Sequence, residues 1–297
     1  MPGLLRRVRL ERNELGALLH FGGWVTVSQL ILQMLVYLDR FFLASFLSLD
    51  AVTLYSVPYE GITRLRVIPA SVMATLYPAM SEHSSDPSRK RVRVLYDASL
   101  RYLLLLLLPG MSFLLVFGKD VLSLWMGMDF AVKAAVVLQA LAAGFFLNSL
   151  AYVSYSVIQA FRKPDIVGKF HLFVSPIYIG FSVLLILRWG IAGAAFAAAL
   201  RFTLDALLLF WVTQKYCGCS LKSVWNRSMT WIFSLGLLLT LTLLLGREAV
   251  PGLMGHLLLA AIAILAYFFG AWRYGLNAQE KPAIVRALNV FNRQATV

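Results

Sequence analysis

Two long apolar segments near the start of the sequence decide the class of fold. The first reads GGWVTVSQLILQMLVYLDRFFLASF (22–46), and after LSLD (47–50) the second reads AVTLYSVPYEGITRLRVIPASVMATLYP (51–78). Each is long enough to cross a bilayer, for which about 20 residues suffice. Both carry charges far from their ends: Asp39 and Arg40, then Glu60, Arg64 and Arg66. Because a charge in hydrocarbon costs at least about 2.5–3.5 kcal/mol, we expect these residues to face a protein interior or a water-filled path.

The composition of the whole chain places it among integral membrane proteins. Of its 297 residues 60% are hydrophobic, and its mean hydropathy is +0.76, whereas soluble proteins have about 45–50% apolar residues. The net charge of +13 suggests nucleic acid in a soluble protein. Here the basic residues lie in short loops between apolar segments, so we expect no nucleic-acid partner.

Hydropathy divides the sequence into eight apolar segments. They lie at about 20–46, 51–79, 97–117, 131–160, 168–187, 191–213, 227–246 and 253–273. The sequence therefore predicts an all-α integral membrane protein with a bundle of about eight transmembrane helices. A run of small residues, GIAGAAFAAAL (190–200), predicts close packing of a neighbouring helix.

Basic residues gather in alternate connections, which predicts the orientation in the membrane. The basic connections contain Arg6, Arg7, Arg9 and Arg12; Arg89, Lys90, Arg91 and Arg93; Arg162, Lys163 and Lys169; Lys215, Lys222 and Arg227; and Arg273, Lys281, Arg286 and Arg293. The intervening connections contain only Lys119, Lys133, Arg188 and Arg247. We therefore expect a multi-pass protein of the plasma (inner) membrane with both termini in the cytoplasm.

Polar residues follow helical spacing on four of the segments, which predicts a polar cavity at the centre of the bundle. The four sets are Gln29, Gln33, Tyr37 and Arg40; Ser56, Glu60, Thr63, Arg64 and Ser71; Asn148, Tyr152, Tyr155 and Gln159; and Arg201 and Asp205.

Depth along the helices suggests which charges can meet. At about 1.5 Å per residue, Asp39 and Glu60 both lie ~12–15 Å below the outer face. Arg40 with Glu60, or Asp39 with Arg64, can therefore form a pair. Arg66 is about 200° around the helix from Arg64, so we expect it to face elsewhere.

Three of these features also have purely structural interpretations. Arg201 and Asp205 are spaced for an ion pair within one helix, and Asp39 with Arg40 for a contact that joins two helices. His171 stands near the start of a segment, where a surface or packing histidine is expected.

No nucleotide-binding loop, serine nucleophile elbow or metal-ligand spacing is found, and we expect no enzyme activity, cofactor or metal. Cys217 and Cys219 alone are too few for a disulfide scaffold.

Four stretches resemble the second lobe of Wzx-type polysaccharide flippases, members of the multidrug/oligosaccharidyl-lipid/polysaccharide (MOP) exporter superfamily. They are LGALLHFGGWVTVSQLILQMLVYLDRFFLASFLSLDAVTLYSVPYEGITRL (15–65), IPASVMATLYPAMSE (68–82), LNSLAYVSYSVIQAFRKPDIVGKFHL (147–172) and GIAGAAFAAALRFTLD (190–205). The resemblance implies a MATE/MOP-like C-terminal lobe of six helices at 20–215. A cytoplasmic basic lead-in at 1–19 precedes it, and two additional transmembrane helices at 216–273 and a cytoplasmic tail at 274–297 follow.

The resemblance also implies a substrate and partners. The substrate expected is a lipid-linked oligosaccharide of the undecaprenyl-pyrophosphate type, flipped across the lipid bilayer by alternating access. The other half of the transporter is expected to be a missing N-terminal lobe, a partner half or a second copy in a homodimer. The residues expected to bind substrate are Arg40, Arg64, Arg201, Asn148, Tyr152 and Gln159, and those expected to be coupling or structural charges are Asp39, Glu60 and Asp205.

Other functions remain open on the sequence alone. A multidrug antiporter or a lipid II flippase of the same superfamily is the nearest alternative. A membrane glycan polymerase or ligase is a second, although its chemistry calls for a larger outer loop than about 13 residues at 118–130. A membrane scaffold that transports nothing is a third.

Overall fold

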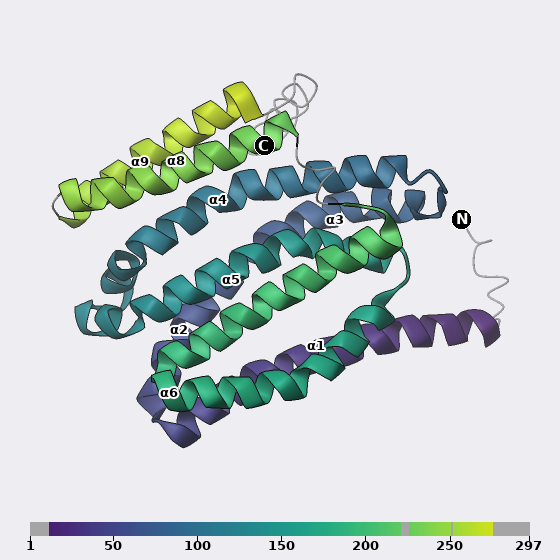
Figure 1. Cartoon of the computed structure of the whole chain (residues 1–297), viewed down its shortest axis with the longest axis horizontal. Coiled ribbons are helices and arrows are strands. Elements are labelled where there is room, and N and C mark those ends of the chain that lie inside the picture. Colours follow the sequence, from purple (N-terminus) through teal and green to yellow (C-terminus); the bar gives the residue numbers. More distant parts are fainter. Residues whose placement is uncertain (1–11, 221–225, 251, 276–297) are drawn as a thin grey trace, which may run out of the picture.

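The computed structural model describes residues 12–220, 226–250 and 252–275, and over these ranges the chain is almost entirely helical (Figure 1). The lead-in 1–19 and the tail 274–297 expected from the sequence lie mostly outside the described residues. The helices are α1 (Arg12–Phe46), α2 (Leu49–Arg64), α3 (Val67–Glu82), α4 (Lys90–Met126), α5 (Met128–Ala160), α6 (Pro164–Val212), α8 (Arg227–Ala249) and α9 (Leu253–Gly270). Short helical turns of other types occupy His83–Ser85 (η1), Thr213–Cys217 (η2) and Ala271–Gly275 (η3).

Six of the described helices are long and apolar enough to cross a membrane: Leu18–Phe46, Lys90–Met126, Met128–Ala160, Pro164–Cys217, Arg227–Ala249 and Leu253–Gly275. Large apolar side chains also cover the outside of the bundle, as on Phe173, Leu245 and Phe269, which are 73%, 73% and 75% exposed. A soluble protein rarely exposes so much apolar surface. The chain is therefore an all-α, multi-pass membrane protein, as predicted.

Helix α5 forms the centre of the bundle, between α4 and α6 (Figure 1). The small residues of 190–200 explain its close approach to α6, because Ala194, Ala195 and Ala198 are completely buried. The backbones come so near that a Cβ atom on Gly144 would lie 2.6 Å from Cα of Ala199. The close packing predicted from the small-residue run is thus confirmed.

Helix α6 consists of two limbs, 164–189 and 191–212, that meet at Gly190. The backbone of Gly190 has φ 59° and ψ −134°, which is not helical and which a residue with a side chain rarely adopts. The two apolar segments predicted at 168–187 and 191–213 correspond to these limbs. Helix α1 packs along α6 (Figure 1).

The apolar segment predicted as one helix at 51–79 is instead two helices, α2 and α3, and the prediction of a single helix was wrong. Pro69 stands in the first turn of α3. A proline has no N–H for the carbonyl four residues earlier, and its ring clashes with that carbonyl. The carbonyl four residues before Pro69 is that of Leu65, where α2 has ended. The amide of Leu65 donates to the Ile62 carbonyl at 3.0 Å, and Arg66 then precedes α3.

Helices α8 and α9 pack against each other and against α4, on the opposite side of the bundle from α1 (Figure 1). Their contact with α4 is mainly apolar and includes Leu104, Leu108, Ile232 and Leu239. Polar contacts join them as well, among them that of the Ser112 and Thr240 hydroxyls at 2.8 Å and that of the Tyr267 hydroxyl with the Leu105 carbonyl at 3.3 Å. These helices extend the bundle without contributing to the cavity described below.

Candidate substrate cavity

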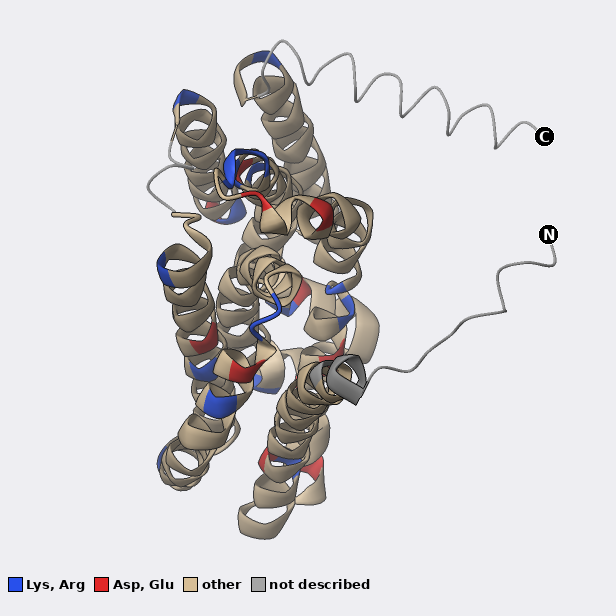
Figure 2. Cartoon of the chain, turned by 90° about the vertical axis from the view of Figure 1, so that its right-hand side faces the viewer, with Lys and Arg blue, Asp and Glu red and all other residues tan. Residues whose placement is uncertain are grey.

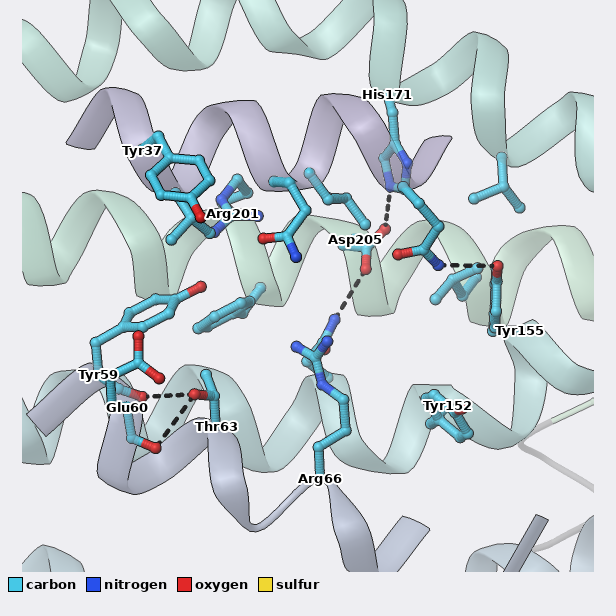
Figure 3. Close-up of a pocket in the computed structure, with 18 of the residues that line it drawn as sticks. Tyr37, Tyr59, Glu60, Thr63, Arg66, Tyr152, Tyr155, His171, Arg201 and Asp205 are labelled. Atoms are coloured by element: carbon cyan, nitrogen blue, oxygen red, sulfur yellow. Dashed lines mark hydrogen bonds and ion pairs between the residues drawn. The ribbon is translucent and has the colours of Figure 1, made fainter. Parts of the chain in front are cut away.

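A cavity of about 530 Å³ lies between α1, α2, α5 and both limbs of α6 (Figure 3). Its polar lining consists of Gln29, Gln33, Tyr37, Arg40, Tyr59, Glu60, Thr63, Arg64, Arg66, Asn148, Tyr152, Tyr155, His171, Arg201 and Asp205. Figure 2 shows charged residues along the lengths of the helices as well as at their ends. The predicted polar cavity is therefore present in the described part of the chain.

The polar set of α1 lines the cavity in full. Gln29, Gln33, Tyr37 and Arg40 follow the i, i+4, i+8, i+11 spacing that places residues on one face of a helix. Among them, the side-chain amide of Gln29 donates to the Tyr155 hydroxyl at 3.4 Å. The helical pattern in the sequence thus predicted this wall of the cavity correctly.

The sets on α2 and α5 line the cavity only in part. Glu60, Thr63 and Arg64 of α2 and Asn148, Tyr152 and Tyr155 of α5 are among the lining residues. Gln159, expected as a substrate residue, is not; it lies one turn beyond Tyr155 along α5. Ser56 and Ser71 are also absent from the lining, and Ser71 belongs to α3 and so no longer shares a helical face with Glu60.

Arg40 and Glu60 form an ion pair across α1 and α2, as one of the two predicted pairings required. The Arg40 guanidinium also lies over the ring of Tyr59, with Cζ 5.9 Å from the ring centroid. The Glu60 side chain is 52% exposed, so this pair lies towards an open side of the cavity.

Asp39 lies in the protein core, and its predicted pairing with Arg64 was wrong. It is completely buried and accepts hydrogen bonds from the hydroxyl of Tyr178 at 2.9 and 2.8 Å, and from Ser182 at 3.2 Å. The reason is the helical step of about 100° between neighbouring residues. This step directs Arg40 into the cavity and Asp39 towards the first limb of α6.

Asp205 is bound by residues of two other segments rather than paired along its own helix with Arg201. Its Oδ1 lies 2.9 Å from Nε2 of His171, and its Oδ2 accepts a hydrogen bond from the Asn148 amide at 2.8 Å (Figure 3). The other ring nitrogen of His171 lies 2.7 Å from the Ser28 hydroxyl. This network joins α1, α5 and both limbs of α6.

His171 is therefore a buried histidine of the cavity wall that packs between helices, which is the second of the two positions expected for it, a surface or a packing site. Its position near the start of an apolar segment gave no sign of its partner, because Asp205 is 34 residues away in the sequence. Spacing within one helix cannot reveal a contact between two limbs that fold back on each other.

Arg201 is a buried cation whose donors are only partly used. It is 8% exposed and lines the cavity. Its guanidinium lies between the rings of Tyr178 and Phe202, with Cζ 5.2 and 5.0 Å from their centroids. Its Nε and Nη2 atoms are buried and have no hydrogen-bond partner among the described residues. Such donors are costly unless a ligand or water satisfies them.

Arg66 changes the charge of the cavity, and the expectation that it faces elsewhere was wrong. The break between α2 and α3 alters the rotation that a continuous helix would give, and Figure 3 shows Arg66 extending from the break towards the middle of the cavity. The lining then has four arginines, with Arg40, Arg64 and Arg201, against the carboxylates of Glu60 and Asp205. The cavity is cationic, because Arg66 joins its lining and Asp39 lies outside it.

The described residues contain no cluster of three or more His, Cys, Asp or Glu placed to hold a metal ion. Cys217 and Cys219 are buried free thiols at the end of η2. Burial raises the pKa of the Cys219 thiol to about 12, which keeps it protonated and unreactive at neutral pH.

Comparison with known proteins points to polysaccharide biosynthesis. Residues 5–135 match a family described as "Polysaccharide biosynthesis protein". A Shigella flexneri protein described as an O-antigen transporter is 34% identical over 201 residues, which are 68% of this chain and 47% of that protein. A Haloferax volcanii protein described as a low-salt glycan biosynthesis flippase is 26% identical over 172 residues, 58% of this chain and 36% of that protein.

A second Haloferax volcanii protein, described as a flippase, is 25% identical over 173 residues, again 58% of this chain and 36% of that protein. The chain thus spans about half the length, or less, of the curated relatives that it matches. Over that span, these similarities confirm the resemblance to Wzx-type flippases of polysaccharide biosynthesis that the motifs predicted.

Proposed function

We propose that this chain forms one lobe of a transporter that flips a lipid-linked oligosaccharide across the inner membrane by alternating access. The relatives described as an O-antigen transporter and as glycan flippases support this substrate class. The cavity supports it independently, because it lies within a bundle of apolar helices and is lined by polar residues. Transporters of this kind bind substrate near the membrane midplane and need no catalytic group.

The observation that carries the proposal is the cationic lining with the unsatisfied donors of Arg201. A polyprenyl pyrophosphate presents several anionic oxygens, and the planar guanidinium group binds such oxygens through two parallel hydrogen bonds. In this proposal Arg201, Arg64 and Arg66 bind the pyrophosphate. Asn148 and Tyr152 contact the sugars, with hydrogen bonds from the amide and stacking on the ring.

Glu60 and Asp205 provide the proposed coupling or structural charges. Glu60 pairs with Arg40, and Asp205 holds the network of His171 and Asn148. Each is the anionic member of a contact between helices, so a cation or proton that binds there would weaken that contact. Such a site is suited to link ion binding to helix movement.

We further propose that a second helical lobe completes the cavity. Tyr37 lines the cavity and is 66% exposed, and Glu60 is 52% exposed. Alternating access needs two halves that move around one site. The second half is an N-terminal lobe of the same polypeptide, a partner subunit or another copy of this chain. The alternating basic connections support an orientation with both termini in the cytoplasm.

The test is a flipping assay with the complete transporter in proteoliposomes. A fluorescent undecaprenyl-pyrophosphate oligosaccharide serves as substrate, and the fraction protected from a membrane-impermeant quencher is measured over time. Arg201→Gln and Arg64→Gln should each reduce the rate at least about tenfold, because a charge-assisted hydrogen bond contributes about 1.5–3 kcal/mol. Arg188→Gln is the matched control, since Arg188 is exposed at the turn between the limbs of α6. Unchanged rates in both cavity variants would refute the proposal.

A further inference from the structure

Asp39 is a buried acidic residue next to the cavity but outside its lining. It is 0% exposed and accepts hydrogen bonds from three hydroxyls, those of Tyr178, Ser182 and Tyr55, the last at 3.4 Å. An ionised carboxylate, which only accepts, suits a site made of hydroxyl donors. The positive charge that acts on Asp39 belongs to Arg201.

Tyr178 contacts both of these charged residues. Its hydroxyl donates to the two Asp39 oxygens at 2.9 and 2.8 Å, and its ring lies beside the Arg201 guanidinium, 5.2 Å from Cζ to the centroid. A buried arginine and carboxylate usually pair through direct, often bidentate, hydrogen bonds. Here the carboxylate is bound by hydroxyls, and Nε and Nη2 of Arg201 have no hydrogen-bond partner among the residues described.

We infer that Asp39 and Tyr178 are positioning residues that set how strongly Arg201 binds an anionic ligand. Asp39 compensates the charge of Arg201 from the core side. Tyr178 occupies the Asp39 oxygens and so leaves Nε and Nη2 of Arg201 without a carboxylate partner. This inference rests on the proposed function, since it assumes that the ligand of Arg201 is anionic.

The consequence is a moderate affinity that permits release. A guanidinium with no counter-charge in a buried site would hold a pyrophosphate tightly, because electrostatic attraction is strong where water is excluded. With Asp39 in place, a bound anion shares Arg201 with a second negative charge and is repelled by it. A transporter needs such a balance, since its substrate must leave as well as enter.

The experiment measures binding of inorganic pyrophosphate to the full chain in nanodiscs by isothermal titration calorimetry. Asp39→Asn should bind pyrophosphate roughly tenfold more tightly, the effect of a unit charge on the order of 10 Å away at an effective dielectric constant of about 20. Tyr178→Phe should bind it several-fold more weakly, because a released Asp39 carboxylate is free to pair directly with Arg201. Asp50→Asn, at an exposed position in the first turn of α2, is the control and should bind as the unaltered protein does.

The two variants are expected to change pyrophosphate affinity in opposite directions, which distinguishes this inference from a purely structural role. A structural role would leave the affinity per folded molecule unchanged or reduced in both variants. If the Asp39→Asn protein does not fold, Tyr178→Phe still decides, because it retains the ring and removes only the hydroxyl. If the unaltered protein binds pyrophosphate, either of two results overturns the inference but leaves the proposed function standing. One is that Tyr178→Phe does not bind pyrophosphate more weakly; the other is that a folded Asp39→Asn does not bind it more tightly. No binding by the unaltered protein overturns the proposed function as well.

Discussion

Substitution of Asp205 tests the polar network that joins α1, α5 and the two limbs of α6. Asp205→Ala removes both acceptors, those facing His171 at 2.9 Å and Asn148 at 2.8 Å. A hydrogen bond to a charged group contributes about 1.5–3 kcal/mol, so two give about 3–6 kcal/mol. Because the site borders a cavity in which water can replace part of this, we expect a destabilisation of about 3 kcal/mol.

Asp205→Asn should cost much less, about 1 kcal/mol, because the network can be rebuilt around an amide. The new carbonyl accepts from Asn148, and the new NH₂ donates to Nε2 of His171 in its other tautomer. The Nδ1–H of that tautomer then donates to the Ser28 hydroxyl, which is already 2.7 Å away. The hydroxyl suits both tautomers, since it can donate or accept.

The assay is reversible unfolding of the purified protein from mixed micelles by increasing SDS, followed by tryptophan fluorescence. Asp165→Ala is the control, because the exposed pair of Asp165 with Lys169 on one helix is worth only about 0.3–0.5 kcal/mol. The reasoning is refuted if Asp205→Asn is as destabilising as Asp205→Ala, or if neither differs from the control.

Three further predictions concern packing, backbone and thiol chemistry. Gly144→Leu should destabilise the α5–α6 contact by about 1–3 kcal/mol, because a Cβ atom at position 144 would lie 2.6 Å from Cα of Ala199. The control in the same SDS titration is Gly110→Leu, because an added Cβ atom there has no neighbouring atom within 4 Å. Gly190→Ala should cost about 1–3 kcal/mol in that titration, because residues with a side chain rarely adopt φ 59° with ψ −134°, and an unchanged midpoint would contradict this. Cys219, buried and with its pKa raised to about 12, should react with a maleimide at pH 7.5 only after denaturation; rapid labelling of the native protein in a Cys217→Ser background would contradict the burial.

The wall contributed by α1 could be predicted from the sequence because one uninterrupted helix carries it. Gln29, Gln33, Tyr37 and Arg40 need only the helical period to share a face. The pair of Arg40 with Glu60 also followed, since the two helices are neighbours in the sequence and the depth of each residue can be counted from the connection between them.

The remaining features depend on where helices bend and which limbs meet. Arg66 faces the cavity because the helix breaks before Pro69, and a hydropathy window reads across such a break. The contact of His171 with Asp205 requires α6 to fold back at Gly190. The burial of Asp39 depends on hydroxyls from the first limb of α6, more than 130 residues further along the chain. None of these long-range contacts has a periodic signal in one sequence.

The reversal of α6 at Gly190 also bears on how the protein enters the membrane. The second limb carries Arg201 and Asp205, and each charge at the centre of a lone helix would oppose insertion by the translocon by about 2.5–3.5 kcal/mol. Their partners Tyr178 and His171 stand on the first limb. The second limb is therefore expected to leave the translocon together with the first, as a preassembled helical hairpin, rather than to partition into lipid by itself.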